Sequence, residues 1–387
     1  MENSARDILF LTDGIPPYVM GGMQRHSLEV CRQLLKHGFH VHLVHCVQSG
    51  ERLPDAGEVK GVIIQNESFT GSLTITGFHF PSPGFFPGHY LRNSLKYAKD
   101  IFDSISNQNF DFIYAQGFTG WHFLRQKNRV TPVWVNFHGL NMFQRTIGLR
   151  SKLEAMMLRG SVKENLKLAD GVISLGGHLT EILNRKIGID ASKIKVHPNG
   201  ISSQWIKSEG ASIQDSNKRR FLFVGRNDKI KQFDLIFGLA NEFKDRAQFG
   251  FVGPFTPDVS QETGITFYGE IKKEEQLKAI YDQHDIIVCA SISEGLPTTL
   301  LEGMARGLVV LTTPVGAASE LINGNGIIVD GFDALAIKKG IQNILAMSET
   351  EFSNAKKRSL ERVRCFTWGA IGEKVAGDIK QLSSKEN

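Results

Sequence analysis

The sequence predicts an α/β protein of two domains, each with a parallel sheet that is covered by helices on both faces. Short apolar runs alternate with amphipathic segments along almost the whole chain, which is the pattern of strands joined by helical crossovers. The chain has 387 residues, which is too long for one ordinary core. A polar stretch at residues 207–218 interrupts the pattern and predicts a linker between the domains.

The first half supplies the strands and the opening helix of one such domain. An apolar run over residues 8–12 is followed by a glycine turn and an amphipathic segment, which predicts a helix near residues 23–36. Pro198-Asn199-Gly200 predicts a tight turn, because Asn and Gly accept left-handed backbone conformations. Further strands are expected at residues 41–44, 112–115, 133–136, 171–174 and 194–196.

The second half repeats this organisation after the linker. Strands are expected at residues 220–225, 249–252, 265–268, 285–289 and 309–312, with a last helix near residues 367–382. Ligands of parallel α/β sheets bind outside the carboxyl ends of the strands. Two such halves in tandem therefore predict Rossmann-like domains that face each other across a ligand cleft.

Composition and charge restrict the class of protein. The charged fraction of 22% is typical of a globular chain, and no apolar run approaches the roughly 18 residues of a membrane-spanning helix. The N-terminus runs straight into a strand, so no signal peptide is expected, and the four cysteines are scattered without CxxC spacing. These features predict a cytoplasmic protein with reduced core cysteines and no metal site. The net charge of +5 permits attraction to anionic substrates or lipid headgroups.

Two glutamates eight positions apart, Glu294 and Glu302, are the most informative residues of the chain. The apolar run at 285–290 predicts a buried strand before them, and Pro297 suits the first turn of a helix. Glu294 is then expected on a loop and Glu302 about one and a half turns into the helix. Both can line one crevice, where free helix N–H groups attract an anion such as phosphate. The alternative is a solvated loop Glu and a surface helix Glu, but the apolar neighbours of Glu302 make an unpartnered carboxylate costly.

The segment from Ser291 to Ala305 resembles a known signature. Its pattern, S-x-x-E-G-L-P-x-x-L-L-E-x-M-A, is similar to that of the retaining glycosyltransferases of family 4, also called glycosyl transferases group 1, which have the GT-B fold. The resemblance implies an acceptor-side domain at residues 1–203, which a C-terminal helix at 366–387 completes. It implies a nucleotide-sugar-binding domain at residues 204–365.

The same resemblance implies roles for the residues of this segment. Glu302 would bind the ribose hydroxyls of the donor, and Glu294 would hold the hydroxyls of the transferred sugar near the reacting carbon. The turn between the two glutamates would also bind the donor, through Gly295, Leu296, Pro297 and Thr298.

Two motifs at strand ends of the first half are further candidates. Gly21 and Gly22 join the first strand to the first helix, and paired glycines let backbone approach a ligand closely. A structural turn is the alternative, but the family has a glycine loop here that contacts the donor diphosphate and sugar. His138 stands in Asn136-Phe137-His138-Gly139 at the end of another strand. A lone histidine is more often structural, but the resemblance implies that His138 binds or orients the donor.

A basic loop follows the first strand of the second half, at residues 224–232. Arg offers a planar fork and Lys a point charge, the usual ways of holding phosphate oxygens. The family pattern maps onto Arg226 and Lys231, whereas Lys229 is expected on the surface. The glycine that follows the lysine in the family is Gln232 here, a departure that weakens the expected loop geometry. Gly253, Tyr268 and Ile271 occupy positions where the family holds the nucleotide base.

Two further stretches allow more than one interpretation. Residues 78–90 contain prolines and aromatic residues and form either an acceptor-side loop or a packed connector. Residues 142–167 carry several Arg and Lys residues among methionines and leucines. Such a helix has either one core face and one solvated face, or it lies on a membrane surface.

The resemblance therefore implies a metal-independent transferase. It would move a sugar from a UDP- or GDP-sugar to a hydroxyl acceptor, such as a glycan or a lipid-linked saccharide, with retention of configuration and without a cofactor. Arg226, Lys231 and helix dipoles would stabilise the leaving diphosphate. The alternatives are a GT-B sugar-nucleotide epimerase, which the Glu-x7-Glu segment fits poorly, and a catalytically inactive nucleotide-sugar-binding subunit. A dehydrogenase is disfavoured because no G-x-G-x-x-G fingerprint is present.

Overall fold

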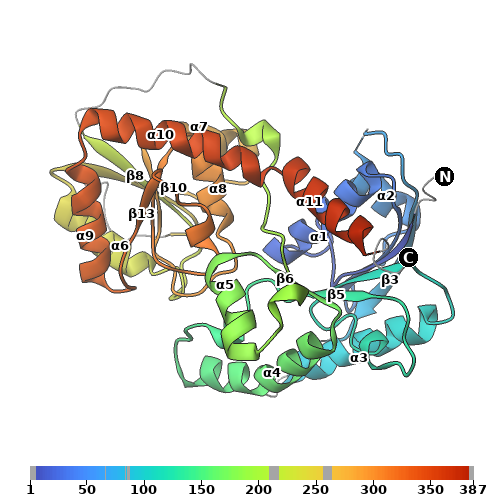
Figure 1. The fold of residues 1–387 in the computed structure, drawn as a ribbon. Coiled ribbons are helices and arrows are strands. Elements are labelled where there is room, and N and C mark those ends of the chain that lie inside the picture. Colours follow the sequence, from blue (N-terminus) through green and yellow to red (C-terminus); the bar gives the residue numbers. More distant parts are fainter. Residues whose placement is uncertain are drawn as a thin grey trace.

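The computed structural model contains two separate parallel sheets with helices packed on both faces, as Figure 1 shows. It describes residues 6–65, 67–82, 84, 88–208, 218–255 and 264–382. Most of the predicted linker, part of the 78–90 stretch and the last five residues of the chain lie outside the described residues. The expected fold class, an α/β protein with two Rossmann-like halves, is confirmed, whereas the domain bounds stay a prediction.

The first sheet has seven parallel strands in the order β3-β2-β1-β4-β5-β6-β7. All strands that the sequence predicted in this half are present. Its strands are β1 (Asp7–Leu11), β2 (His40–Gln48), β3 (Leu73–Phe80), β4 (Phe112–Gln116), β5 (Val133–Asn136), β6 (Gly171–Ser174) and β7 (Ile194–Val196). Its helices are α1 (Gly22–Lys36), α2 (Ala56–Ile64), α3 (His89–Ile105), α4 (Leu149–Leu168) and α5 (Gly177–Glu181).

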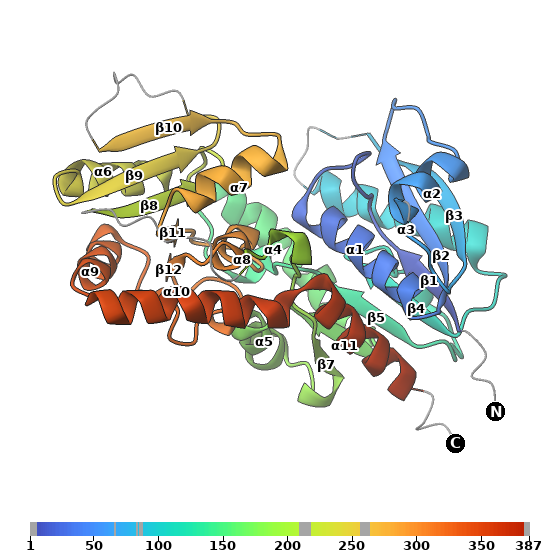
Figure 2. The same cartoon turned by 90° about the horizontal axis from the view of Figure 1, so that it is seen from above.

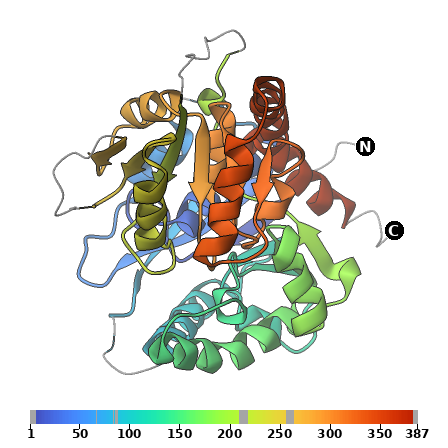
Figure 3. The ribbon, with the colours of Figure 1, turned by 90° about the vertical axis from the view of Figure 1, so that its left-hand side faces the viewer.

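The second sheet has six parallel strands in the order β10-β9-β8-β11-β12-β13. Its strands are β8 (Arg219–Val224), β9 (Ala247–Val252), β10 (Ile265–Gly269), β11 (Ile286–Cys289), β12 (Val309–Thr312) and β13 (Gly326–Ile328). Its helices are α6 (Phe233–Phe243), α7 (Glu274–Asp282), α8 (Thr298–Ala305), α9 (Ala334–Leu345) and α10 (Glu349–Val363). Figure 3 shows this sheet with its covering helices in front of the first half.

The strands form where apolar runs bury both faces of the sheet. All residues of β4, β5, β6, β11 and β12 are buried, which is the pattern of a parallel sheet covered on both sides. The sequence prediction missed the edge strands β3 and β13. Most residues of β3 are only half-buried and include Thr and Gly, so no continuous apolar run marks it.

The chain passes between the halves at two points that lie side by side. The Ile201 amide donates to the Phe366 carbonyl at 2.8 Å, and the Trp368 amide donates to the Ile201 carbonyl at 3.0 Å. Helix α11 (Trp368–Gln381) then packs on α1, as Figure 2 shows. The last helix of the chain therefore covers the first sheet, although it follows the second one.

The prediction of a left-handed turn at Pro198-Asn199-Gly200 is wrong. Neither Asn199 nor Gly200 has a positive φ. A Cβ at Gly200 would lie 2.7 Å from Trp368 Cδ2, so glycine is needed for close packing between the two crossing segments. The buried Asn199 side chain serves the cleft instead, as described below.

Cys31, Cys46 and Cys289 are buried free thiols, but Cys365 is exposed, so the expectation of four core cysteines is wrong at that position. No helix among the described residues is both long and apolar enough to cross a bilayer.

Candidate active site

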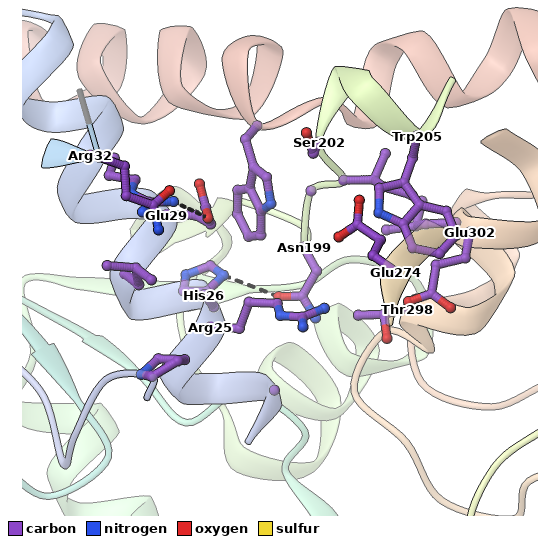
Figure 4. Close-up of a pocket in the computed structure, with 18 residues that line it drawn as sticks. Arg25, His26, Glu29, Arg32, Asn199, Ser202, Trp205, Glu274, Thr298 and Glu302 are labelled. Carbon is purple, nitrogen blue, oxygen red and sulfur yellow. Dashed lines mark hydrogen bonds and ion pairs between the residues drawn. The ribbon is translucent and has the colours of Figure 1, made fainter. Parts of the chain in front are cut away.

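A cavity of about 270 Å³ opens between the two halves, where α1 faces α7 and α8 (Figure 4). Three of the predicted site residues line it, namely Gly22, Thr298 and Glu302. The crossing segments contribute Asn199 and Trp368 to its wall. The cavity therefore lies at the interdomain cleft that the sequence predicted.

Glu302 lies where the sequence placed it, on the second turn of α8, and is half-buried. The Tyr281 hydroxyl donates to Glu302 Oε2 at 2.7 Å, which leaves the other carboxylate oxygen for a ligand. Burial raises the pKa of the Glu302 carboxyl, and the hydrogen bond from Tyr281 opposes this. The carboxylate thus has one partner from the core, as an ionised group in an apolar setting requires.

Glu294 and Lys231 form an ion pair across two loops of the second half. The Lys231 Nζ lies 2.5 Å from Glu294 Oε1, and both side chains are less than one fifth exposed. Burial disfavours the charged ammonium, but the Glu294 carboxylate, together with Cys289 and Asp228, outweighs burial and holds the pKa of Lys231 above its ordinary value. The Lys231 charge also acts on Glu302 and lowers the pKa of its carboxyl. The two glutamates of the motif are therefore linked electrostatically through one lysine.

Arg226 belongs to the same loop as Lys231 but has a different carboxylate partner. Its side chain is 81% exposed, and its guanidinium lies 3.4 Å from Asp228 Oδ2. The structure therefore brings Lys231 to Glu294 but not Arg226, whose guanidinium is accessible to a ligand.

Gln232 adopts the left-handed conformation that favours glycine, with φ 56° and ψ 42°, where it caps α6. Its Nε2 donates to the Phe332 carbonyl at 3.0 Å. Gln232 thus has the backbone conformation that a glycine would adopt without strain, so the loop keeps a left-handed residue at this position.

The backbone conformation at Gly21 and Gly22 does not require glycine at either position. Gly21 is extended, with φ and ψ both 168°, and Gly22 is the first residue of α1. A Cβ at Gly22 would meet no atom within 4 Å. Because neither strain nor packing requires glycine at position 22, the open space in front of it is available to a ligand.

His138 follows β5 and has a left-handed backbone, with φ 57°. The Asn136 side chain stabilises this conformation, because its Oδ1 accepts a hydrogen bond from the His138 backbone amide at 2.8 Å. Both ring nitrogens are buried and lack a hydrogen-bond partner among the described residues. Burial lowers the pKa of His138 to about 4, and the nearby Asn199 side chain, which makes no well-formed hydrogen bond to the ring, opposes this only in part, so the imidazole is neutral near pH 7. A neutral ring with an unused N–H suits a sugar hydroxyl better than it suits a charge partner for phosphate.

His138 is connected to the cavity through His26. The two rings meet edge to face with centroids 4.7 Å apart, and His26 lines the cavity. Asn199 Oδ1 lies 3.0 Å from His26 Nδ1, and Asn199 Nδ2 donates to the Leu296 carbonyl at 3.4 Å. Asn199 therefore joins the histidine pair of the first half to the glutamate loop of the second.

The first half also holds the backbone of the Glu294 loop directly. Gln144 Nε2 donates to the Glu294 carbonyl at 2.7 Å, and the Ser293 hydroxyl lies 3.3 Å from Asn141 Oδ1. A Cβ at Gly139 would lie 3.3 Å from the Gly295 nitrogen, so the loop that contains Gly139 is in close contact with the loop that contains Gly295. These contacts fix the position of Glu294 relative to His138.

Arg25 lines the cavity and was missed by the sequence prediction. It projects from α1 towards Thr298 and Glu302 in Figure 4, and its charge lowers the pKa of Glu302. The sequence did carry a signal for Arg25. A cation near a helix N-terminus is electrostatically unfavourable, so its presence there indicates a role other than stabilising the helix. The first turn of α1 contains no acidic residue.

Gly253, Tyr268 and Ile271 do not line this cavity among the described residues. A Cβ at Gly253 would lie 2.0 Å from the Gly225 carbonyl oxygen, so this glycine permits two loops to pack closely. Tyr268 and Ile271 are half-buried against the core. Their proposed contact with a nucleotide base stays a prediction.

Another cavity, of about 250 Å³, lies wholly in the first half, beside the glycine loop. Its polar lining includes Asp13, Gln24, Gln48 and Asn93, and its aromatic lining includes Tyr90. Gln24 Nε2 donates to Asp13 Oδ1 at 3.0 Å. Burial raises the pKa of Asp13 to about 6, while its own backbone hydrogen bond and Gln24 oppose the rise.

Among the described residues, no group of three or more His, Cys, Asp or Glu side chains is arranged to hold a metal ion.

Two family models match separate halves of the chain. Residues 20–205 match Glycosyltransferase Family 4, and residues 218–347 match Glycosyl transferases group 1. The chain belongs to these glycosyltransferases. The predicted family is confirmed, and the two matches correspond to the two sheets of the structure.

Curated relatives of this glycosyltransferase are distant in sequence. An uncharacterised glycosyltransferase of Methanocaldococcus jannaschii is 24% identical over 404 residues, which covers 96% of this chain and 97% of the relative. The alpha-maltose-1-phosphate synthase of Mycolicibacterium smegmatis is 23% identical over 251 residues. That match covers 57% of this chain and 65% of the synthase, so the chain spans just under two thirds of that relative.

Solved structures confirm the GT-B fold of this glycosyltransferase. The sucrose-phosphate synthase of Thermosynechococcus elongatus superposes with a TM-score of 0.75 at 19% identity, over 98% of this chain and all of that one. A trehalose-6-phosphate structure from E. coli, bound with UDP-2-fluoro glucose, superposes with a TM-score of 0.70 at 14% identity. It covers 97% of this chain and 99% of that one.

Proposed function

We propose that this glycosyltransferase transfers a sugar from a nucleotide-diphosphate-sugar to a hydroxyl acceptor, with retention of configuration and without a metal ion. The observation that carries the proposal is the ion pair of Lys231 with Glu294, linked electrostatically to the half-buried Glu302. A cation that is paired with one carboxylate and acts on a second, beside the N-terminus of α8, suits a substrate that combines phosphate with hydroxyl groups.

The donor would lie with its ribose at Glu302 and its diphosphate at the N-terminus of α8. The Glu302 oxygen that Tyr281 leaves unused accepts ribose hydroxyls. The free N–H groups at the start of α8, together with Lys231 and Arg226, neutralise the diphosphate. A UDP- or GDP-sugar is the favoured donor, and the structural neighbour that carries UDP-2-fluoro glucose supports a UDP-sugar.

Glu294 would hold the hydroxyls of the transferred sugar rather than attack it. Its carboxylate is engaged by Lys231, which lowers its nucleophilicity and fixes its position. His138 would donate a hydrogen bond to another hydroxyl, since its ring nitrogens lack partners among the described residues. The acceptor oxygen forms its bond to the anomeric carbon on the face from which the diphosphate departs. The acceptor proton passes to the departing phosphate oxygen, so no protein nucleophile is required.

Positive groups of the protein would replace a metal ion at the leaving group. Lys231 is charged at neutral pH because its pKa is raised, and the Arg226 guanidinium is accessible. Such groups stabilise the charge that develops on the departing diphosphate.

The acceptor is assigned to the cavity beside the glycine loop. Carboxylate and amide groups with an aromatic ring beside them, here Asp13, Gln48 and Tyr90, are the chemistry that recognises a sugar. A glycan or a lipid-linked saccharide fits this lining.

Two alternatives have less support. A sugar-nucleotide epimerase needs further free carboxylates at the sugar. Glu29 and Glu274 do not meet this need, because they already form ion pairs with Arg32 and Lys278. A catalytically inactive nucleotide-sugar-binding subunit would keep the donor site without turnover, and only an assay separates it from an enzyme.

The test begins with a thermal-shift panel of UDP-, GDP- and ADP-sugars, followed by transfer assays with soluble and lipid-linked acceptors. The double variant Arg226→Ala with Lys231→Ala should lose transfer by at least about a hundredfold, as removal of leaving-group stabilisation implies. Lys229→Ala removes another cation of the same loop, which the sequence assigned to the surface; it is the matched control and should retain activity. Retained turnover in the double variant contradicts the proposed clamp. Donor binding without any transfer supports the inactive subunit, and conversion of the donor sugar without an acceptor supports the epimerase.

A further inference from the structure

Helix α4 has an apolar face on the side opposite its core contact. Its buried residues are Ala155, Val162, Asn165 and Leu166, which share one face by their spacing. Leu149, Leu153 and Met156 repeat at helical spacing on the opposite face and are exposed by 85%, 45% and 61%. One core face and one solvated face, the first interpretation of this helix from the sequence, therefore leave out an observation, because the outward face is apolar along the N-terminal half of the helix.

Basic side chains border this outward stripe. Helix α4 carries five basic residues, Arg150, Lys152, Arg159, Lys163 and Lys167, against two acidic ones, Glu154 and Glu164. Each acid is paired, Glu154 with Arg150 at 3.0 Å and Glu164 with Arg125 at 2.7 Å. By helical spacing, Lys163 and Lys167 lie on the outward side of the helix, in line with the apolar stripe.

The helix lies at the outer edge of the first half. Figure 1 shows α4 along the lower border of the molecule, and Figure 3 shows it again at the base, where no other element lies beyond it. Exposed apolar residues that gather on one helix face, flanked by cations, fit an interface in which the apolar groups enter acyl chains and the cations meet headgroups.

We propose that the outward face of α4 docks on the surface of an anionic lipid bilayer. Charge complementarity decides for this partner, because the net charge of the helix is +3 and its basic groups border the apolar stripe. The proposal does not depend on the donor or the acceptor chemistry proposed above.

The docking helix is tied to the cleft. Arg159 Nε donates to the Met142 carbonyl at 2.7 Å, in the short turn that follows His138 and Gly139. Gln144, two residues beyond Met142, donates to the Glu294 carbonyl. A substrate anchored in the same bilayer would therefore approach the cleft from the side at which α4 begins.

The experiment is co-sedimentation of the full chain with vesicles of phosphatidylcholine, alone or with about 30 mol% phosphatidylglycerol. The chain should sediment with the anionic vesicles and not with the neutral ones, and about 0.5 M salt should release it. Leu153→Ser with Met156→Ser, and separately Lys163→Glu with Lys167→Glu, should each reduce the bound fraction by about tenfold or more.

Matched controls test whether the effect belongs to this face. Val130→Ser with Leu335→Ser removes two apolar residues that are exposed by 90% and 76% elsewhere, and it should leave binding unchanged. Lys339→Glu with Lys357→Glu makes the same charge change on exposed positions of the second half. Urea unfolding checks that every variant is folded.

Three results would overturn the proposal. The chain stays in the supernatant with anionic vesicles, or it binds neutral and anionic vesicles equally, or the controls lose as much binding as the α4 variants. Sedimentation velocity adds a fourth test, since a dimer that Leu153→Ser with Met156→Ser dissociates would show that a second copy of the chain covers this face.

Discussion

Gly22 illustrates how a single residue can be assigned to binding rather than to folding. Its backbone is helical and its missing side chain faces the open cavity, so the structure gives no folding reason for glycine. Glycine costs about 0.5–1 kcal/mol relative to alanine within a helix, a cost that a ligand requirement explains.

Gly22→Ala should keep the unfolding free energy unchanged or raise it by up to about 1 kcal/mol. The KM for the donor should rise about tenfold, because the methyl group occupies space that the donor approaches. Gly369→Ala in α11 is the matched control, since a Cβ there also meets no atom within 4 Å. Equal donor KM values for the two variants would remove Gly22 from the binding site.

The buried histidines should make stability depend on pH. Burial lowers the pKa of His45 and of His138 to about 4, from an ordinary value of 6.5. The unfolded chain therefore binds more protons between pH 6.5 and 4, and the stability from each histidine is complete above pH 6.5 and lost as pH falls towards 4. Asp13 acts in the opposite direction, because its folded pKa is raised to about 6.

Between pH 7 and pH 4, each of the two histidines should lower the free energy of unfolding by up to about 3 kcal/mol, whereas Asp13 should raise it by about 2 kcal/mol. Urea unfolding at pH 7 and near pH 4 measures the difference. His45→Asn, away from the cleft, should make the fall between the two pH values smaller by up to about 3 kcal/mol. An unchanged fall in this variant would show that His45 is not held neutral by the fold.

At the scale of elements, the sequence pattern located the strands and helices that local apolar runs determine, and it missed features that depend on contacts between distant segments. The fully buried strands β4, β6 and β11 follow from continuous apolar runs. Helix α8 was also predicted, although it begins at Thr298 and Pro297 is its N-cap, one residue before the first turn in which the sequence placed it. Strand β13 begins at Gly326 and was missed, because glycine is disfavoured in strands, whereas β7 is equally short but consists of Ile, Lys and Val and was predicted. The reason for Gly200 was also missed, since it depends on Trp368, which is far away in the sequence.

Gly200→Ala should lower the unfolding free energy by about 1–3 kcal/mol, because the new methyl group overpacks against the Trp368 ring where the chain crosses between halves. Gly377→Ala in α11, where a Cβ meets no atom within 4 Å, should be neutral or stabilising. Urea unfolding compares the two variants. If both are equally stable, the contact of Gly200 with Trp368 does not hold the crossing segments together.

At the scale of the whole molecule, the fold and the family could be predicted from one sequence, but the arrangement of the cleft could only be predicted in part. Glu294 and Lys231 meet as their motifs suggest. Arg25 and Asn199 enter the cleft through the packing of the first half against the second, which no local pattern encodes. Arg226 matches its motif yet is 81% exposed, so a motif fixed its place on the loop but not the direction of its side chain.

The central claim is that the cleft between the halves binds a nucleoside diphosphate through Glu302. Isothermal titration of the full chain with UDP, GDP and ADP tests it most directly, with Glu275→Ala as the control because Glu275 is exposed on α7 outside the cavity. At least one of the nucleotides should bind, and Glu302→Ala should weaken its Kd by about tenfold or more, which corresponds to about 1.4 kcal/mol. Binding of none of the three nucleotides, or equal affinity in Glu302→Ala and Glu275→Ala, would contradict the claim.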